Sequence, residues 1–260
     1  MKQILAFEHV EECRKYERTI EYLAGMIGSY KHILEEQYAL RDSPKGIVWT
    51  TDELATEVFS NQWIPAYTNK NVIFITPDLN GWKHLFLSQL EDKPLPDARS
   101  FYEQFSENDL LVIVAHELTH HSDLFIDEFD DEREDSIWFE EGMCQYLPRK
   151  LLLSERRLEE ITAVELSLVH EFQEEYGKRL LDDFGTGSYG DRLSSIMFDY
   201  WRSYLAVKYL VEVRADQNVM KVFGEYHKWH HEGRKVPLTE YFGLEEKFFL
   251  GSGRPLDIDY

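Results

Sequence analysis

The first third of the chain shows the hydrophobic spacing of one long helix. Between residues 9 and 38, hydrophobic side chains recur at alternating steps of three and four, as on one face of an α-helix. These positions are Cys13, Tyr16, Ile20, Leu23, Ile27, Tyr30 and Leu34. We expect this face to pack on its own domain rather than on a partner helix, because Gly25 and Gly28 weaken a free-standing helix.

Two short segments carry strand signals. Gly46–Thr50 and Asn71–Thr76 are rich in β-branched and aromatic residues, which favour a pleated, half-buried surface. The stretch from Asp78 to Pro96 contains several turn residues and predicts a loop, with one or two helical turns near Trp82–Leu90. The sequence therefore predicts a small sheet.

A buried helix is expected to begin near Glu107. Ser106 and Asp109 have the spacing of a capping box, and the apolar run Leu110–Ala115 follows directly. We expect this helix to continue through His121.

The second half of the chain has mostly helical periodicity. The predicted helices are 137–147, 154–176, 191–212 and 216–231. The acidic stretch 127–135 predicts a solvated loop, and Gly185, Gly187 and Gly190 predict a flexible one. Together these elements predict a mostly helical α+β fold with a small mixed sheet.

The charge of the chain limits its partners. The 260 residues include 28 Lys and Arg against 49 Asp and Glu, a formal net charge of −21. Such a field repels nucleic acid and anionic membrane surfaces and attracts cationic peptides. The 43% hydrophobic content is enough to drive folding, which excludes wholesale disorder.

Cysteine usage and apolar run lengths indicate a cytoplasmic protein. Cys13 and Cys144 are too few and too far apart for a disulfide framework or a zinc finger. The beginning of the chain lacks the apolar run of a secretory signal, and the run Leu110–Ala115 is far shorter than a membrane span. The sequence leaves the oligomeric state open.

The strongest chemical signal is His116-Glu117-Leu118-Thr119-His120, an HExxH motif. Residues at i and i+4 share a helical face, so both imidazoles can reach one Zn²⁺, with Glu117 beside them as a candidate base. Two histidines and a glutamate within a buried helix would be costly to bury without pairing or coordination. We expect one zinc ion per chain.

A catalytic zinc needs a third protein ligand and an open position for water. Glu140 and Glu141, at the start of the next predicted helix, are the candidates. The spacing alone leaves the choice between them open.

The segment from Trp138 to Tyr146, WFEEGMCQY, resembles the W-x-x-E-G-x-A-E-Y segment of gluzincin metallopeptidases, the thermolysin and aminopeptidase N type. This resemblance implies that Glu141 is the third ligand and that Glu140 faces solvent or substrate. Cys144 takes the place of a small residue, which indicates packing. The expected function is peptide-bond hydrolysis of a peptide or protein substrate.

The resemblance extends to the segment from Phe198 to Leu210, which is similar to the gluzincin helix that carries a catalytic tyrosine. It implies that Tyr200 donates a hydrogen bond to the oxyanion formed during attack on the carbonyl. Tyr204 and Tyr189 are the alternative donors.

Two departures from the family pattern keep other functions open. Gln145 stands where the family has a carboxylate that orients a zinc-bound histidine, although its amide oxygen can accept the same hydrogen bond. We find no counterpart of the segment that anchors a substrate amine in aminopeptidases, so exopeptidase activity is not supported. The alternatives are a binding or regulatory module on a peptidase scaffold, and a zinc hydrolase of non-peptide amides.

The expected organisation follows from these assignments. Residues 1–45 form a helix packed on the catalytic unit, 46–125 the sheet with the HExxH helix, and 126–260 a helical lobe with the third ligand. The active site is expected in the cleft between the lobes. By resemblance, Asn71–Thr76 is expected to be the edge strand that pairs with substrate.

Overall fold

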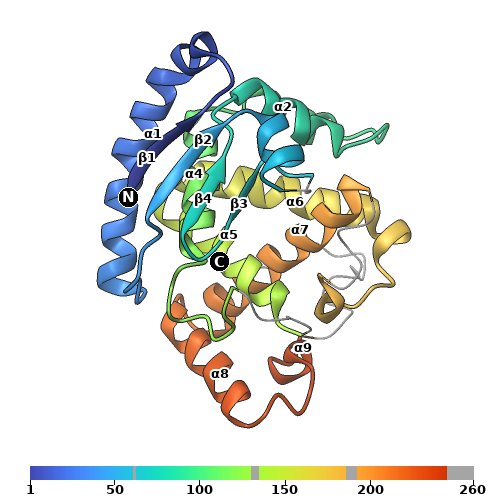
Figure 1. Cartoon of the computed structure of the whole chain (residues 1–260). Helices are drawn as coiled ribbons and strands as arrows, with labels where there is room; N and C mark the ends of the chain where they lie inside the picture. The colour runs from blue at the N-terminus through green and yellow to red at the C-terminus, as the bar shows by residue number, and fades with distance from the viewer. Residues whose placement is uncertain (61–62, 130–134, 186–191, 245–260) are drawn as a thin grey trace. The chain divides into compact units, whose positions relative to one another are not determined.

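The computed structural model describes residues 1–60, 63–129, 135–185 and 192–244 (Figure 1). Its strands are β1 (Lys2–Ala6), β2 (Gly46–Thr50), β3 (Ala66–Thr68) and β4 (Val72–Ile75). Its α-helices are α1 (Val10–Gln37), α2 (Leu79–Ser88), α3 (Pro96–Glu103), α4 (Glu107–Thr119), α5 (Ile137–Leu152), α6 (Glu155–Tyr176), α7 (Leu193–Tyr209), α8 (Val219–His231) and α9 (Leu238–Tyr241). Short π-helical turns lie at Leu54–Val58 and Leu210–Arg214, and a 3₁₀ turn lies at Leu181–Asp183. The predicted α+β, mostly helical class is confirmed.

The chain forms two compact units, each assembled from several stretches of sequence. The first comprises Met1–Gln89, Arg99–Asp131 and Cys144–Leu158. The second comprises Leu90–Ala98, Glu132–Met143 and Glu159–Tyr260. The sheet, α1 and α4 belong to the first unit, and α7, α8 and α9 to the second.

The sheet of the first unit has the strand order β1-β2-β4-β3. β1, β2 and β4 run parallel, with α1 as the crossover between the first two, and β3 runs antiparallel to β4. A crossover helix is what two neighbouring parallel strands require. The sheet is therefore small and mixed, as predicted.

The position of Asn71–Thr76 differs from the expectation. Its strand, β4, pairs with β2 on one side and with β3 on the other, so it lies inside the sheet. The edge strands are β1 and β3, and β3 has only three residues, which gave too weak a signal to be predicted. The expectation that Asn71–Thr76 forms the edge is therefore wrong.

The core of the first unit lies between the sheet and two helices. The predicted stripe of α1 supplies Ile20, Leu23, Ile27, Tyr30 and Leu34, all buried. These residues join Trp49, Ile73 and the apolar residues of α4 in one cluster. Figure 1 shows α1 and α4 beside the strands that supply this cluster. The prediction that α1 packs on its own domain is confirmed.

The core of the second unit is aromatic. Phe139 stacks on Tyr226 with ring centroids 4.5 Å apart, and also contacts Phe223 and Phe242. The indole of Trp138 donates a hydrogen bond of 3.0 Å to Asp182. Stacked and edge-on rings of this kind stabilise a core beyond the area they bury. The start of α5, which carries Glu141, is held in this unit by two of its largest side chains.

Among the described residues, no helix combines the length and the apolar character needed to cross a membrane.

Candidate metal centre

Helix α4 begins at the predicted capping box. The carboxylate of Asp109 accepts hydrogen bonds from the backbone N–H and the hydroxyl of Ser106, at 2.9 and 2.7 Å. Its other oxygen accepts from the guanidinium of Arg157, at 2.9 and 3.2 Å. These bonds satisfy donors that a helix start leaves without intrahelical partners. They fix the first turn of the helix that carries the HExxH motif.

The two histidines of the motif lie one turn apart at the end of α4. The helix ends at Thr119, with His120 as its C-cap, two residues earlier than expected. The Nε2 atoms of His116 and His120 are 3.2 Å apart, and both side chains are half-buried. The two imidazoles therefore present their Nε2 atoms to the same point.

Glu141 of α5 completes a group of three. One ligand atom from each of His116, His120 and Glu141 lies within 4.8 Å of the other two. Glu140 is not part of this group, and it is buried, with 3% of its surface exposed. The expectation of a solvent-facing Glu140 is therefore wrong, because the residue lies inside the protein.

The spacing of the imidazoles fits a zinc ion. Four ligands at about 2.0 Å in tetrahedral geometry have neighbouring ligand atoms about 3.3 Å apart. The 3.2 Å separation of the Nε2 atoms of His116 and His120 is close to this value. Two neutral imidazoles and one carboxylate also form the ligand set of many catalytic zinc sites. These three residues could therefore hold a metal ion.

Glu117 follows His116 on α4 and is buried, with 7% of its surface exposed. It is not one of the three grouped ligands. A carboxylate that neighbours a ligand in the chain without being a ligand itself is a candidate base.

The turn of α4 that carries the histidines is held by a chain of hydroxyl groups. The Thr119 hydroxyl donates to the backbone oxygen of Ala115 and bonds to the phenol of Tyr30, both at 2.7 Å. Burial raises the pKa of Tyr30 well above its usual value, so the phenol stays protonated. Sequence analysis identified Tyr30 only as a core residue, because its partner is 89 positions away.

A hydrogen bond also joins the end of α4 to the edge strand β3. The Nε2 atom of His121 is 2.7 Å from the hydroxyl of Thr68 in β3. Burial, together with the nearby His120, lowers the pKa of His121 to about 3. His121 is therefore a neutral hydrogen-bonding group, and sequence analysis missed this role.

The three candidate tyrosines have different surroundings. Tyr200 on α7 is half-buried, and its ring meets the ring of Phe184 edge-on at 5.0 Å. Tyr204 is fully buried, and its hydroxyl is hydrogen-bonded to Thr162 at 2.8 Å. Tyr189 lies outside the described residues. The contacts of Tyr204 are those of a packing residue, whereas Tyr200 keeps part of its surface exposed.

The residues after Glu141 are packed tightly. Cys144 is fully buried, as its expected packing role requires, and Gln145 is buried at 7% exposure one turn after Glu141. A Cβ atom at Gly142 would lie closer than 3.0 Å to the backbone oxygen of Ser203 in α7. Only glycine permits this close approach of the two helices.

Comparison with known proteins yields no relative. No protein-family model matches the chain, and neither a curated protein nor a solved structure is significantly similar to it.

Proposed function

We propose that the chain is a zinc-dependent metallopeptidase. The observation that carries this proposal is the convergence of His116, His120 and Glu141, with Glu117 beside the first histidine. This arrangement supports a hydrolytic metal centre because it provides three ligands and a separate base.

The three ligands would hold one zinc ion through the two Nε2 atoms and a carboxylate oxygen. When bound, zinc supplies a Lewis acid that polarises the scissile carbonyl and acidifies water.

The roles of the other residues follow from hydrolysis of a peptide bond. Water adds to the carbonyl carbon while Glu117 takes a proton from that water. The C–N bond then breaks, and Glu117 returns that proton to the leaving amine. Tyr200 donates its phenolic hydrogen to the oxygen that becomes negatively charged during the attack.

Substrate binding is proposed at β3 instead of Asn71–Thr76. β3 is one of the two edge strands of the sheet, and its last residue, Thr68, is hydrogen-bonded to His121, the neighbour of His120. An extended peptide can pair with such an edge through main-chain hydrogen bonds. The charge of −21 favours peptides with Lys or Arg side chains. We place this activity in the cytoplasm, because Cys13 and Cys144 form no disulfide.

The test combines metal content with activity. Purified protein is analysed for bound zinc, and a broad peptide library is digested with the wild type and with Glu117→Gln. We expect one zinc per chain in both proteins, since Glu117 is not a ligand. Cleavage should fall by several orders of magnitude in the variant, because the attacking water loses its base.

Other results would favour the alternative functions. Full zinc content without any cleavage by the wild type would indicate a binding module on this scaffold. Hydrolysis of small non-peptide amides alone, abolished by Glu117→Gln, would indicate an amide hydrolase. Absence of bound zinc would contradict the proposal.

A further inference from the structure

Strand β1 is an edge of the sheet, and its outer side faces no other strand among the described residues. The strand order leaves β2 as its single neighbour, and the two strands pair from Lys2 to Ala6 without a bulge. Four of the five residues of β1 are exposed, including Ile4 at 42% and Leu5 at 54%. Proteins normally shield such an edge with a proline, a bulge or a covering segment. The exposed sequence KQILA shows none of these.

The outer side of β1 presents backbone groups at alternate residues. The N–H of Lys2 donates to the backbone oxygen just before β2 at 2.9 Å, and the backbone oxygen of Ala6 accepts from a threonine hydroxyl of β2 at 2.8 Å. The backbone groups of successive strand residues point to opposite sides, so those of Lys2 and Ala6 face β2. The N–H and C=O groups of Gln3 and Leu5 therefore face outward.

Charges of opposite sign flank the apolar centre of this edge. Lys2 is the first residue of β1, and Glu8 follows the strand by two residues. Both side chains are exposed, and neither forms an ion pair within the described part of the chain. The edge thus has a positive beginning, the apolar residues Ile4 and Leu5, and a negative end.

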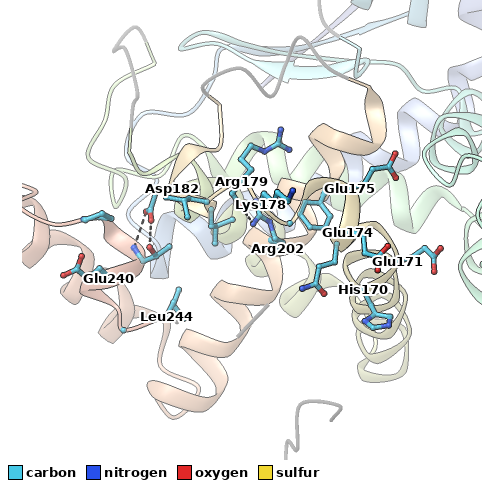
Figure 2. Close-up of a pocket in the computed structure, with 18 of the residues that line it drawn as sticks. His170, Glu171, Glu174, Glu175, Lys178, Arg179, Asp182, Arg202, Glu240 and Leu244 are labelled. Carbon is cyan, nitrogen blue, oxygen red and sulfur yellow. Dashed lines mark hydrogen bonds between the residues drawn. The ribbon is translucent and has the colours of Figure 1, made fainter. Parts of the chain in front are cut away.

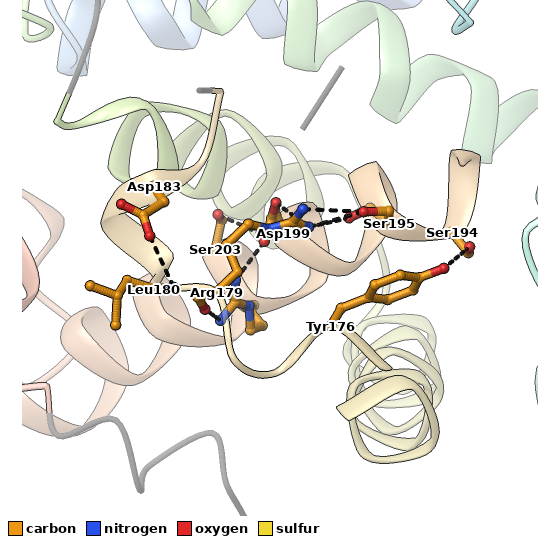
Figure 3. Close-up of polar contacts among 9 residues, drawn as sticks. Tyr176, Arg179, Leu180, Asp183, Ser194, Ser195, Asp199 and Ser203 are labelled. Carbon is orange, nitrogen blue, oxygen red and sulfur yellow. Dashed lines mark hydrogen bonds and ion pairs between the residues drawn. The ribbon is translucent and has the colours of Figure 1, made fainter. Parts of the chain in front are cut away.

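Charged groups in a cavity of the second unit show the opposite situation. In Figure 2, Asp182 of this cavity accepts hydrogen bonds from the backbone N–H and the hydroxyl of Thr239. Arg179 and Arg202 both pair with the buried carboxylate of Asp199, and Figure 3 shows the pair with Arg179. These charges are compensated within the fold, whereas those beside β1 are available to a partner.

We propose that β1 pairs antiparallel with β1 of a second copy of this chain. In a two-fold interface, residue i of one copy faces residue j of the other, and j faces i. With Leu5 opposite Leu5 at the axis, each Lys2 faces Glu8 of the second copy. Both charges at each end are then matched, which a parallel pairing would not achieve. The strand is therefore complementary to itself.

The same register joins the outward backbone groups and covers the apolar side chains. Residues that exchange both hydrogen bonds lie directly opposite each other in an antiparallel ladder, and Leu5 can do so with Leu5 of the second copy. Ile4 faces Ala6 of the second copy on the other side of the sheet, where such cross-strand neighbours are in contact. The two sheets become one continuous sheet. This interface is independent of the proposed peptidase activity.

Sedimentation velocity of the full chain, without an added N-terminal tag, tests the association. We expect a monomer–dimer equilibrium with a Kd of about 10 μM, because a strand edge is a small interface. Salt at about 0.15 M limits the repulsion between two copies of net charge −21. A monomer at concentrations tenfold above that Kd would overturn the proposal.

An axis variant assigns the dimer to β1. Leu5→Lys should weaken dimerisation at least tenfold, because it places two like charges opposite each other. Met220→Lys is the matched control, since Met220 is a hydrophobic residue of α8 with 47% exposure, and its Kd should equal that of the wild type. Wild-type affinity in Leu5→Lys would overturn the proposal. If Leu5→Lys does not fold, the charge variants decide.

Charge reversal tests the direction and register of the pairing. Lys2→Glu and Glu8→Lys should each weaken dimerisation about tenfold, because each change makes both facing pairs repulsive. The double variant should return to within about twofold of the wild type, since the facing charges are opposite again. An equimolar mixture of the two single variants should dimerise more tightly than either variant alone. A double variant and a mixture as weak as the single variants would overturn the proposed pairing.

Discussion

The phenol of Tyr30 donates its hydrogen bond to the hydroxyl of Thr119, one residue before the second histidine of the proposed metal centre. The direction follows from the single hydroxyl hydrogen of Thr119, which goes to the backbone oxygen of Ala115. Thr119 must therefore be the acceptor toward Tyr30. A residue of the N-terminal helix α1 thus holds the helical turn that runs from His116 to His120.

Tyr30→Phe should destabilise the protein by about 1 to 2 kcal/mol, because the buried Thr119 oxygen loses its donor. Zinc affinity should fall less than tenfold, since both histidines stay on the same helix. Urea unfolding and zinc titration would measure the two effects. Tyr22→Phe is the control on the same helix, because the bond from Tyr22 to Asn108 is solvent-exposed and should contribute little. Equal decreases of the unfolding free energy in the two variants would contradict this account.

Alkaline pH should lower the unfolding free energy of the protein because two of its phenol groups are buried. Burial raises the folded-state pKa of Tyr30 well above 10 and that of Tyr67 to about 12. The unfolded chain therefore loses the phenolic protons first. The contribution of the two phenols to the unfolding free energy is complete below pH 10, and it is lost as the pH rises above 10. Tyr30 should lower the unfolding free energy by about 1.4 kcal/mol per pH unit in that range, and Tyr67, which is only partly buried, should lower it by less. Unfolding curves between pH 8 and 11.5 would measure the slope, and Tyr30→Phe should reduce it.

The choice between Glu140 and Glu141 as the third ligand can be made with isosteric changes. Glu141→Gln should weaken zinc binding at least a hundredfold, because a tetrahedral site rarely survives the loss of one of three protein ligands. Glu140→Gln should keep one zinc per chain. Elemental analysis of both dialysed proteins gives the answer, and full zinc in Glu141→Gln with none in Glu140→Gln would reverse the assignment.

Tyr200→Phe tests the proposed oxyanion donor. The loss of one hydroxyl should lower kcat by about 10²-fold to 10³-fold with little change in KM and in zinc content, as expected for an interaction made only in the transition state. Tyr204→Phe should instead lower stability by about 1 kcal/mol, since it loses the bond to Thr162, and should leave kcat unchanged. Tyr189→Phe completes the set. Loss of turnover in either control, with kcat intact in Tyr200→Phe, would remove Tyr200 from the mechanism.

Gly142→Ala should destabilise the protein by about 1 to 3 kcal/mol, because the new methyl group collides with the backbone of Ser203. Gly224→Ala is a control within a helix of the same unit, since no atom lies within 4 Å of the added carbon. That change should be neutral or slightly stabilising. Thermal unfolding of both variants would measure the difference, and similar melting temperatures would show that α5 can move away from α7.

Helix α4 and its two histidines were predictable because the sequence signals that define them are local. The bonds between Ser106 and Asp109 form within four residues, so the start of α4 follows from the sequence alone. The spacing of His116 and His120 likewise needs only a helix.

Proline was the main source of error in the helix boundaries. Pro96 was interpreted as a turn residue, yet it is the first residue of α3, where a proline costs no hydrogen bond. The helix predicted to end at Leu147 continues through Pro148 to Leu152. Leu147 and Pro148 are both buried within this helix, and the sequence pattern does not reveal that burial.

Long-range pairing explains the missed strands. β1 pairs with β2 across a helix of 28 residues, and β3 consists of Ala66, Tyr67 and Thr68 alone. β3 lacks the length, and β1 lacks the alternation, that identifies a strand by itself. The resemblance to a family was carried by a few residues around Glu141, and it could not reveal the position of β4 within the sheet.

Helix α5 belongs to both compact units. Its residues before Cys144 belong to the second unit, and its residues from Cys144 onward belong to the first unit. The other chain segments of the two units also alternate along the sequence. No single cut therefore separates the gene into two parts that each encode one unit. Neither unit can be transferred to another protein as a contiguous module, so recombination can pass on this fold only as a whole.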